Sequence, residues 1–411
     1  MLAAERVLSY NKHGRYCVCI IRPNIHLPRE IKMNKSMNNS YIEVNLNTLR
    51  ENVRAIGRTL PVGVHIIPVL KDNAYGLGLV PVAAALEPME QICAFAVSHV
   101  SEGMELRAAG IRKSILVMSC ALPFQLETAV DAELTLACAR PGFASELAAA
   151  ARAAGKTAHI HIKIDAGLHR IGFETGDELM ALASELSEAG GQISVDGAFS
   201  HFSDAGDTER VEQEYADFMS ALRRLERFGV HVPFRHIACS AASELYTGME
   251  LDAVRVGRRL YMDNPEKEHQ TGIIRELASW RTYITAVYKR RAGERVGYGK
   301  GISLDSDRDI ATVGIGYGDG LDESFAGIKA PVLVNGRQAR ILAVFMDQCL
   351  VDVTGIDCAP GDELTVFGYD GRGGFISSQD QAMLISAAEG CGLTSALSGR
   401  VARVYTDRPF E

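Results

Sequence analysis

The 411-residue sequence lacks paired cysteines, a membrane-length apolar run and an excess of positive charge. Its nine cysteines are scattered, odd in number and without any CxxC pair. This distribution is typical of reduced thiols in a cytoplasmic protein and argues against a disulfide framework or a zinc site. Because no apolar run approaches the roughly 18 residues of a membrane span, we expect no membrane partner.

The formal net charge of −8 argues against nucleic acid or an anionic membrane as the main partner. Apolar residues make up 47% of the chain and charged residues 23%, which is close to the average for globular proteins and sufficient for a large core. The length favours two to three domains. We find no internal repeat and no low-complexity segment.

The first 38 residues differ from the rest of the chain. Basic residues are interleaved with the short apolar run Cys17–Ile21, but no small-residue cleavage site follows, so a signal peptide is not expected. Met33 and Met37 stand just before the first convincing element. We interpret residues 1–38 as an extension with little fixed structure, produced by an upstream start codon.

From Tyr41 to about Tyr261, short apolar strands alternate with helical patterns. Asn47 is a plausible N-cap for the first helix, because apolar residues recur after it at helical spacing. Further helices are expected over Phe143–Ala154 and Thr208–Phe228. The eight strand candidates are Val64–Leu70, Cys93–Ser98, Ser114–Ser119, Leu134–Cys138, His159–Asp165, Ser194–Ser200, His236–Ser240 and Ala253–Val256.

Eight strand–helix units in succession predict an α/β fold, a (β/α)8 TIM-like barrel followed by a mostly β C-terminal domain. A doubly wound open sheet is the alternative, since periodicity does not show closure; the count of eight favours the barrel. After about Ser279 short strands are punctuated by glycine turns, including an Asn335-Gly336 hairpin. These strands are expected at Arg281–Lys289, Ile310–Ile315, Pro331–Val334, Arg340–Phe345, Leu350–Val353 and Glu363–Phe367, with one helix at Ser378–Cys391.

The predicted domains are therefore the extension at 1–38, a cofactor-binding barrel at 39–278 and a β-rich domain at 279–411. Lys71 directly follows the first barrel strand, in the segment Ile67–Gly76. In a barrel this strand end is the catalytic rim. A desolvated amine there could have a lowered pKa and attack an aldehyde. The alternative is a solvent-exposed lysine at a strand end.

The block Lys-Asp-Asn-Ala-Tyr-Gly at 71–76 resembles the cofactor-lysine motif of the alanine racemases, which are barrel-type (fold-type III) pyridoxal-phosphate enzymes. The resemblance extends from about Tyr41 to Arg408. It implies that pyridoxal 5′-phosphate (PLP) is bound to Lys71 and that Tyr75 is among the cofactor-binding residues.

The segment Lys163–Phe173 is a second matching block. The resemblance implies that Arg170 hydrogen-bonds the cofactor's phenolic oxygen and contacts the substrate. It also makes Lys163 a candidate for carbamylation, which would neutralise a lysine facing inward on an apolar strand. The alternative is a salt bridge from Lys163 to a neighbouring carboxylate.

Ser200-His201-Phe202 ends another strand, and the resemblance stacks His201 on the pyridine ring; a hydrogen-bonded core histidine is the alternative. His159 and His161 alternate along one strand. Since no third ligand is in view, we interpret both as barrel packing and expect no metal site.

The last barrel strands carry Cys239–Ala242 and Val254–Arg258. The resemblance implies that Ser240, Gly257 and Arg258 bind the phosphate, in keeping with the usual barrel phosphate site. It places Arg255 at the pyridine nitrogen, where a guanidinium keeps the nitrogen unprotonated and limits transamination. Solvated strand-end cations are the alternative for both arginines.

In the second domain, Arg295–Gly299 resembles the segment with the catalytic tyrosine, here Tyr298. Two further blocks imply substrate contacts by Tyr317, Met346 and Asp347. The C-terminal block implies that Tyr405 reaches the phosphate. The chain departs from the family at Cys239, usually asparagine, and at Leu342–Phe345, where an arginine is common, which leaves the preferred substrate less certain than the reaction.

The resemblance implies a two-base racemisation of alanine that supplies D-alanine for peptidoglycan, with Lys71 serving the D-enantiomer and Tyr298, from the partner in a homodimer, the L-enantiomer. Bases on opposite faces are what inversion requires, and each is worth roughly 10²–10⁴-fold. Three alternatives are a racemase preferring serine or another small amino acid, a barrel-type PLP amino-acid decarboxylase and a non-catalytic PLP carrier. The Val-Gly-Tyr-Gly block argues against the decarboxylase and the β domain against the carrier.

Overall fold

The computed structural model describes residues 6–10, 16–20, 38–174, 176–262, 274–299, 301–385 and 391–408. The chain divides into two compact units, Met1–Asn38 and Asn39–Glu411. In the first unit β1 (Arg6–Tyr10) pairs antiparallel with β2 (Tyr16–Ile20). We expected little fixed structure in residues 1–38, but the β-branched and aromatic residues of these two segments favour strands. The rest of the extension, apart from Asn38, lies outside the described residues.

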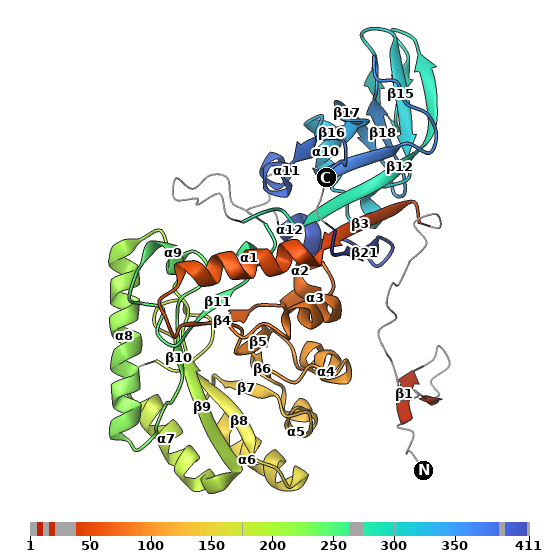
Figure 1. The fold of residues 1–411 in the computed structure, drawn as a ribbon. Helices are drawn as coiled ribbons and strands as arrows, with labels where there is room; N and C mark the ends of the chain where they lie inside the picture. Colours follow the sequence, from red (N-terminus) through yellow and green to blue (C-terminus); the bar gives the residue numbers. More distant parts are fainter. Residues whose placement is uncertain are drawn as a thin grey trace. The chain divides into compact units, whose positions relative to one another are not determined.

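The barrel prediction is confirmed, with the fold drawn in Figure 1. The eight parallel strands are β4 (His65–Pro68), β5 (Ala94–Val97), β6 (Ser114–Val117), β7 (Thr135–Cys138), β8 (Ala158–Lys163), β9 (Ile193–Phe199), β10 (Arg235–His236) and β11 (Ala253–Val256). The seventh strand is much shorter than the predicted His236–Ser240. The carbonyl groups of His236, at its end, and of the following Ile237 also accept hydrogen bonds from the Arg255 guanidinium.

The ring of strands is closed. Strands β5 to β10 pair in order, and β11 pairs with β4, so that Val256 lies opposite Pro68. Parallel bridges then join β4 to the β5 segment, at Val69 and Ala96, and Cys239 after β10 to Arg255 on β11. The open doubly wound sheet is therefore excluded.

Helices cover the outside of the barrel strands (Figure 1). They are α1 (Leu46–Thr59), α3 (Leu79–Leu86), α4 (Val100–Ala108), α5 (Leu126–Asp131), α6 (Phe143–Ala154), α7 (Asp177–Ala189) and α8 (Thr208–Arg227), together with the short α9 (Ala242–Leu245). The prediction of Asn47 as the N-cap of α1 is wrong. Asn45 ends the preceding strand in an extended conformation and its side chain accepts the Thr48 N–H at 2.9 Å. Asn47 lies inside the helix and donates to Glu51.

The second layer of the fold is a nine-stranded sheet in the order β20-β19-β16-β17-β18-β15-β12-β3-β21. The strands are β3 (Ser40–Asn45), β12 (Ala278–Arg290), β15 (Arg308–Val313), β16 (Pro331–Val334), β17 (Arg337–Val344), β18 (Cys349–Asp352), β19 (Glu363–Tyr369), β20 (Phe375–Ile376) and β21 (Ala402–Thr406). All six predicted strands are present. The β3 strand, which precedes the barrel in the sequence, pairs antiparallel with β12 and parallel with β21.

Turns and short helices connect the strands of this sheet. Asn335 and Gly336 join β16 to β17 with φ values of 49° and 77°, as the hairpin prediction requires. A separate pair, β13 (Arg295–Val296) and β14 (Ile302–Ser303), flanks Tyr298. The predicted helix over Ser378–Cys391 is α11 (Ser378–Leu384), and α12 (Cys391–Ser395) follows it; residues 386–390 lie outside the described part. The remaining short helices are α10 (Ser324–Gly327) and the 3-10 turns Pro123–Gln125, Gly190–Gln192, Arg258–Leu260 and Tyr317–Asp319.

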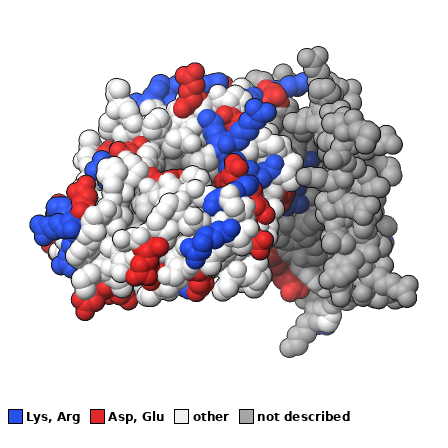
Figure 2. All heavy atoms as spheres, turned by 90° about the horizontal axis from the view of Figure 1, so that it is seen from below, with Lys and Arg blue, Asp and Glu red and all other residues white. Residues whose placement is uncertain are grey.

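One large hydrophobic cluster extends from the barrel into the sheet, and it includes Phe95, Tyr261, Trp280 and Phe367. On the face shown in Figure 2, acidic and basic side chains are interspersed. Within the described residues, no helix combines the length and hydropathy that crossing a membrane requires.

Candidate active site

Lys71 lies at the carboxyl end of the first barrel strand, as predicted. Two backbone hydrogen bonds fix the residues before it, from Val69 N–H to Val256 O at 2.8 Å and from Leu70 N–H to Ala96 O at 2.7 Å. The Lys71 side chain is half-buried, and its Nζ lies 5.9 Å from the centre of the Tyr75 ring. The backbone just before Lys71 is therefore fixed by hydrogen bonds to β11 on one side and to β5 on the other.

The chain turns in an unusual way immediately after Lys71. The short helix α2 (Lys71–Tyr75) contains four residues with left-handed backbone, Asp72, Asn73, Ala74 and Tyr75, at φ values of 53–56°. An L-residue in this conformation costs roughly 1–2 kcal/mol. Leu79 N–H donates to the Asn73 side chain at 2.8 Å, and Ala74 is buried. This turn was not predicted from the sequence, in which Asp72 and Asn73 are the local signals for it.

Two buried cations occupy the barrel interior. Lys163 at the end of β8 is 2% exposed and Arg255 on β11 is 4% exposed. Lys163 Nζ and Arg255 Cζ each lie 5.5 Å from the centre of the Phe199 ring. Burial, together with the Arg255 charge, lowers the pKa of Lys163 to about 8.

The expected alternative for Lys163, a salt bridge, is not formed within the described residues. Its ammonium donates to the backbone carbonyl of Ile164 at 2.7 Å, and no described carboxylate lies within 4.0 Å of it. Lys163 is therefore a buried amine whose neutral form is more populated at a given pH than that of a free lysine.

Neutral acceptors surround the Arg255 guanidinium. It donates to the ring nitrogens of His236, at 2.6 Å, and His201, at 3.0 Å. It also donates to the carbonyls of Ser200, at 2.6 Å, and Ile237, at 3.0 Å. Burial lowers its pKa to about 10, so it stays charged at neutral pH. The positive charge is held inside the barrel without a described carboxylate partner.

Two histidines, His236 and His161, form a hydrogen-bonded chain that ends at Arg255. Because His236 Nδ1 accepts from Arg255, its Nε2 carries the proton and donates to His161 Nδ1 at 2.9 Å. Burial lowers the pKa of His161 to about 4 and that of His236 well below its usual value. His161 therefore packs in the barrel, as predicted, while His159 pairs with Asp196 at 2.8 Å. The described residues contain no metal-binding group of three or more His, Cys, Asp or Glu side chains.

His201 follows β9 and accepts a hydrogen bond from Arg255 at 3.0 Å. Burial, together with the positive charges of Arg255, Lys163, Arg170 and Lys71, lowers its pKa to about 3. The imidazole is therefore neutral.

The predicted phosphate-binding residues form two groups. Ser240 Oγ accepts the Gly257 N–H at 3.3 Å, and a Cβ added to Gly257 would stand 2.3 Å from the Tyr75 hydroxyl. Arg258 follows at the start of a 3-10 turn. Tyr405 donates to Leu77 O at 3.1 Å, and burial raises its pKa to about 12. All of these residues except Tyr405 come from the barrel.

Asp165 organises the loop that carries Arg170. Its carboxylate accepts the backbone N–H groups of Gly167, His169 and Arg170 at 2.9–3.1 Å. The Arg170 side chain is exposed. A cavity of about 620 Å³ lies beside this loop, lined mainly by acidic residues of the loop and of the start of α8, and it contains none of the predicted cofactor residues.

Three of the predicted residues of the second domain, Tyr298, Tyr317 and Met346, are exposed, and with the half-buried Phe345 they form a group that we call the tyrosine face. Tyr298 is 87% exposed, and its ring meets Phe345 edge-on at 5.0 Å. The Tyr317 N–H donates to Phe345 O at 2.9 Å. Asp347 is exposed beside the face. No hydrogen bond, ion pair or ring contact between described residues joins the tyrosine face to Lys71.

The two positions at which the sequence departs from the family pattern, Cys239 and Phe345, both lie beside predicted site residues. Cys239 is half-buried and bridges through its backbone to Arg255. Phe345 supplies the ring on which Tyr298 rests.

Comparison with known proteins identifies the architecture. The family model described as the alanine racemase N-terminal domain matches residues 44–265, and the model of the alanine racemase C-terminal domain matches residues 277–405. The chain belongs to the alanine racemase family. An alanine racemase of Desulforamulus reducens is 35% identical over 335 residues, covering 80% of this chain and 90% of the relative.

Solved alanine racemase structures agree with this assignment. The enzyme of Clostridium difficile 630 superposes with a TM-score of 0.85 at 27% identity, covering 90% of this chain and 97% of that one. The enzyme of Streptomyces lavendulae gives 0.83 at 31% identity, covering 90% and 97%. The enzyme of Bacillus anthracis, described with bound L-Ala-P, gives 0.83 at 29% identity, covering 90% and 95%.

Proposed function

We propose that the protein is an alanine racemase that interconverts L-alanine and D-alanine with PLP held by Lys71. The observation that carries the proposal is the position of Lys71 just after β4, beside the paired strand β11, whose Arg255 donates a hydrogen bond to His201. Catalytic groups of barrel enzymes lie at this rim. Membership of the alanine racemase family supports the same reaction.

The residues present fit PLP. Arg255 is a buried cation whose partners are neutral, which suits a site for an anionic group. The Ser240 hydroxyl and the Gly257 amide lie together, and Gly257 has no side chain between its amide and Tyr75. In the proposed arrangement Ser240, Gly257, Arg258 and Tyr405 hold the phosphate, and His201 packs on the ring.

PLP, when bound, makes the Cα–H bond of an attached amino acid acidic. The chain then has to supply a base on each face of Cα. We propose that Lys71 exchanges the proton on one face and the Tyr298 hydroxyl on the other, so that Lys71 serves D-alanine and Tyr298 serves L-alanine. Arg255 would stand at the ring nitrogen of PLP, and because a guanidinium keeps its proton at neutral pH, it would leave that nitrogen unprotonated and so disfavour transamination.

The low pKa of Lys163 supports its carbamylation. A neutral amine is the form that adds to carbon dioxide, and burial holds the pKa of Lys163 at about 8. The resulting anion would balance the charges of Arg170 and Arg255. Mass spectrometry of the intact protein prepared in bicarbonate, with Lys163→Ala as the control, tests for the added mass.

The exposure of Tyr298 supports a homodimer with shared sites. A catalytic tyrosine that is 87% exposed within one chain needs a surface to complete its environment, and a second copy can supply it. We propose that the tyrosine face of one subunit closes the site of the other. Tyr317, Met346 and Asp347 would then contact the substrate together with Arg170 of the partner barrel.

We place the barrel at residues 39–278 and the β-rich domain at residues 279–411 as part of the proposal. We also propose a cytoplasmic enzyme that supplies D-alanine for peptidoglycan. Six described cysteines are free, which agrees with a reducing compartment.

Incubation of the purified protein with L-alanine or L-serine tests the function. We expect D-alanine to accumulate until the two enantiomers are equal, and faster than D-serine does from L-serine. Faster racemisation of serine would overturn the substrate, and release of carbon dioxide without racemisation would overturn the reaction. Lys71→Ala is the control, and it should lack both activity and bound PLP.

A further inference from the structure

The run of left-handed backbone after Lys71 has no counterpart elsewhere in the described residues. Five other non-glycine residues have positive φ, and each is isolated: Glu133, His169, Leu251, Lys329 and Asn335. At positions 72–75, by contrast, four consecutive residues adopt this conformation. Such a turn persists only where surrounding contacts determine it. The contacts that hold it therefore also decide where Lys71 lies.

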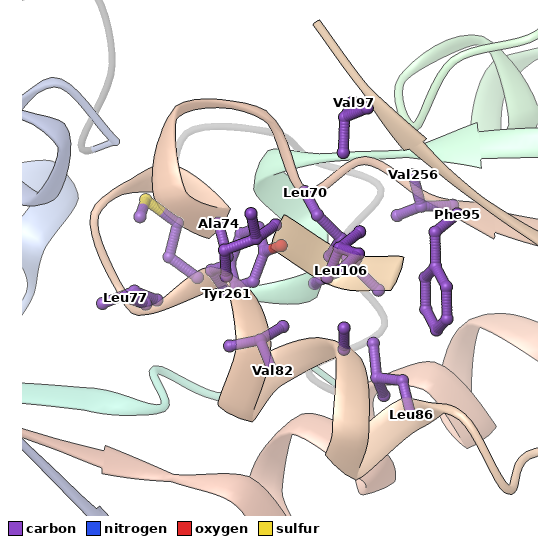
Figure 3. Packing of buried hydrophobic residues seen from close by; sticks show 14 of the residues in the cluster. Leu70, Ala74, Leu77, Val82, Leu86, Phe95, Val97, Leu106, Val256 and Tyr261 are labelled. Carbon is purple, nitrogen blue, oxygen red and sulfur yellow. The ribbon is translucent and has the colours of Figure 1, made fainter. Parts of the chain in front are cut away.

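The end of the turn is held by the core and by the C-terminal segment. Figure 3 shows Leu70 and Ala74 within the buried cluster that includes Tyr261. Beyond the turn, Arg403 Nε donates to Gly76 O at 3.0 Å. A Cβ on Gly76 would stand 1.8 Å from the Thr394 carbonyl oxygen, so the chain is tightly enclosed there.

The start of the turn depends on a different contact. The Asp72 N–H donates to Glu102 Oε1 at 2.6 Å. The other oxygen of the same carboxylate accepts the N–H groups of Ser98, at 2.8 Å, and His99, at 3.0 Å. One half-buried carboxylate thus ties the residue after Lys71 to the end of the neighbouring strand β5.

Helix capping explains only part of this arrangement. Glu102 is in the first turn of α4, and its bond to the His99 N–H is one half of a capping box. Helix capping involves only N–H groups at the start of the same helix, whereas the Asp72 N–H lies 30 residues before Glu102 in the sequence. The bond to Asp72 is the additional feature.

We propose that Glu102 is a positioning residue for Lys71. By holding the Asp72 amide, it sets the first left-handed residue and so fixes the direction in which the lysine leaves the strand. The inference rests on the proposed role of Lys71 as the cofactor lysine. Glu102 itself need not touch the cofactor or the substrate.

The test compares wild-type protein with Glu102→Ala in two states. In protein freed of PLP, hydrogen exchange of the backbone amides at 72–76 is followed by mass spectrometry. In protein with PLP, kcat and KM for L-alanine are measured. Borohydride, which reduces the C=N bond between Lys71 Nζ and the aldehyde carbon to a stable amine, then reports how much PLP is attached to Lys71.

For Glu102→Ala we expect exchange at 72–76 to become faster by about tenfold or more, since the turn opens locally. We expect kcat to fall by about 10²-fold, as a displacement near 1 Å can cause, while KM changes little. Glu105→Ala is the matched control, because Glu105 is on the same helix and exposed. It should leave all of these quantities unchanged.

A second substitution separates positioning from capping. The Asp72 side chain is exposed, and glycine adopts positive φ without steric cost. Asp72→Gly should therefore restore most of the kcat lost in Glu102→Ala, whereas it cannot repair a lost helix cap. Should Glu102→Ala not fold, Glu102→Gln, with the same length and one acceptor oxygen, replaces it in both comparisons.

Unchanged exchange at 72–76 in Glu102→Ala would overturn the inference, as would a kcat loss that Asp72→Gly does not restore. Failure of the proposed function gives a different result. In that case borohydride would attach no PLP to Lys71 in the wild-type protein, whatever the exchange at 72–76 shows.

Discussion

The barrel interior and the tyrosine face contrast sharply in burial and in hydrogen bonding. In the barrel, Arg255 and Lys163 are almost fully buried, and every described contact of Arg255 goes to a neutral group of neighbouring strands. On the tyrosine face, Tyr298 is 87% exposed, and the only aromatic ring among the described residues that contacts it is that of Phe345. One half of the proposed site is therefore organised by the chain itself, and the other half needs a second surface.

The contrast predicts that stability and activity respond differently in the two regions. Buried groups serve both the fold and the site, so their substitution affects both. An exposed group can serve the site alone. Variants at Tyr298 and at His161 test the two sides of this comparison.

The largest expected effect is that of Tyr298→Phe on activity. Loss of the hydroxyl removes one of the two proposed bases, and we expect kcat for L-alanine to fall by about 10²–10⁴-fold. Because the ring is exposed and its contact with Phe345 is kept, the free energy of unfolding should change by less than about 0.5 kcal/mol. Racemisation kinetics and urea denaturation measure the two quantities. A large loss of stability would show that Tyr298 is part of the folded core.

A smaller effect is expected from the buried histidines, on stability. His161 has a pKa of about 4 in the folded protein against 6.5 for the free side chain, chiefly because of burial. The unfolded chain therefore binds more protons between these values, and stability is lost as the pH falls from 6.5 towards 4. The slope for one histidine reaches about 1.4 kcal/mol per pH unit.

Urea denaturation of His161→Gln at several pH values measures that slope. We expect the pH dependence between 6.5 and 4 to become shallower in this variant. His231→Gln, at an exposed position, is the control and should leave the slope unchanged. Equal slopes in all three proteins would mean that His161 is protonated in the fold.

Much of the fold could be predicted from the sequence, because the signals are local. The eight barrel strands are short apolar runs between amphipathic helices, and Asn335-Gly336 specifies its own turn. The pairing of β3 with β12 and β21 joins residues more than 200 positions apart, for which no local pattern exists. Asn47 was predicted as the helix cap in place of Asn45 because the apolar periodicity of α1 does not show where β3 ends.

The site could be predicted in part. The motifs predict Lys71, His201 and Arg255 as site residues. In the structure Arg255 donates to His201, and its strand pairs with the strand that precedes Lys71. The sequence analysis missed the supporting residues Glu102 and His236, because their roles depend on hydrogen bonds across strands. A glutamate in the first turn of a helix and a histidine on a strand both have ordinary structural explanations.

The smallest effect is expected from removal of residues 1–36, so that the chain starts at Met37. Residues 39–411 form a compact unit by themselves, and both family models match within it. We expect the melting temperature and the racemisation rate to be unchanged within error. A loss of several degrees in the melting temperature would show that the extension stabilises the fold.

The central claim is that Lys71 and Tyr298 act together from different chains, and complementation tests it most directly. Lys71→Ala and Tyr298→Phe homodimers should each be nearly inactive. Unfolding and refolding equal amounts together makes about half of the dimers mixed, each with one intact site, if the assembly is a closed two-fold dimer. We predict recovery of about a quarter of wild-type activity. If a refolded wild-type control is active and the mixture is not, the two bases do not meet across a subunit interface.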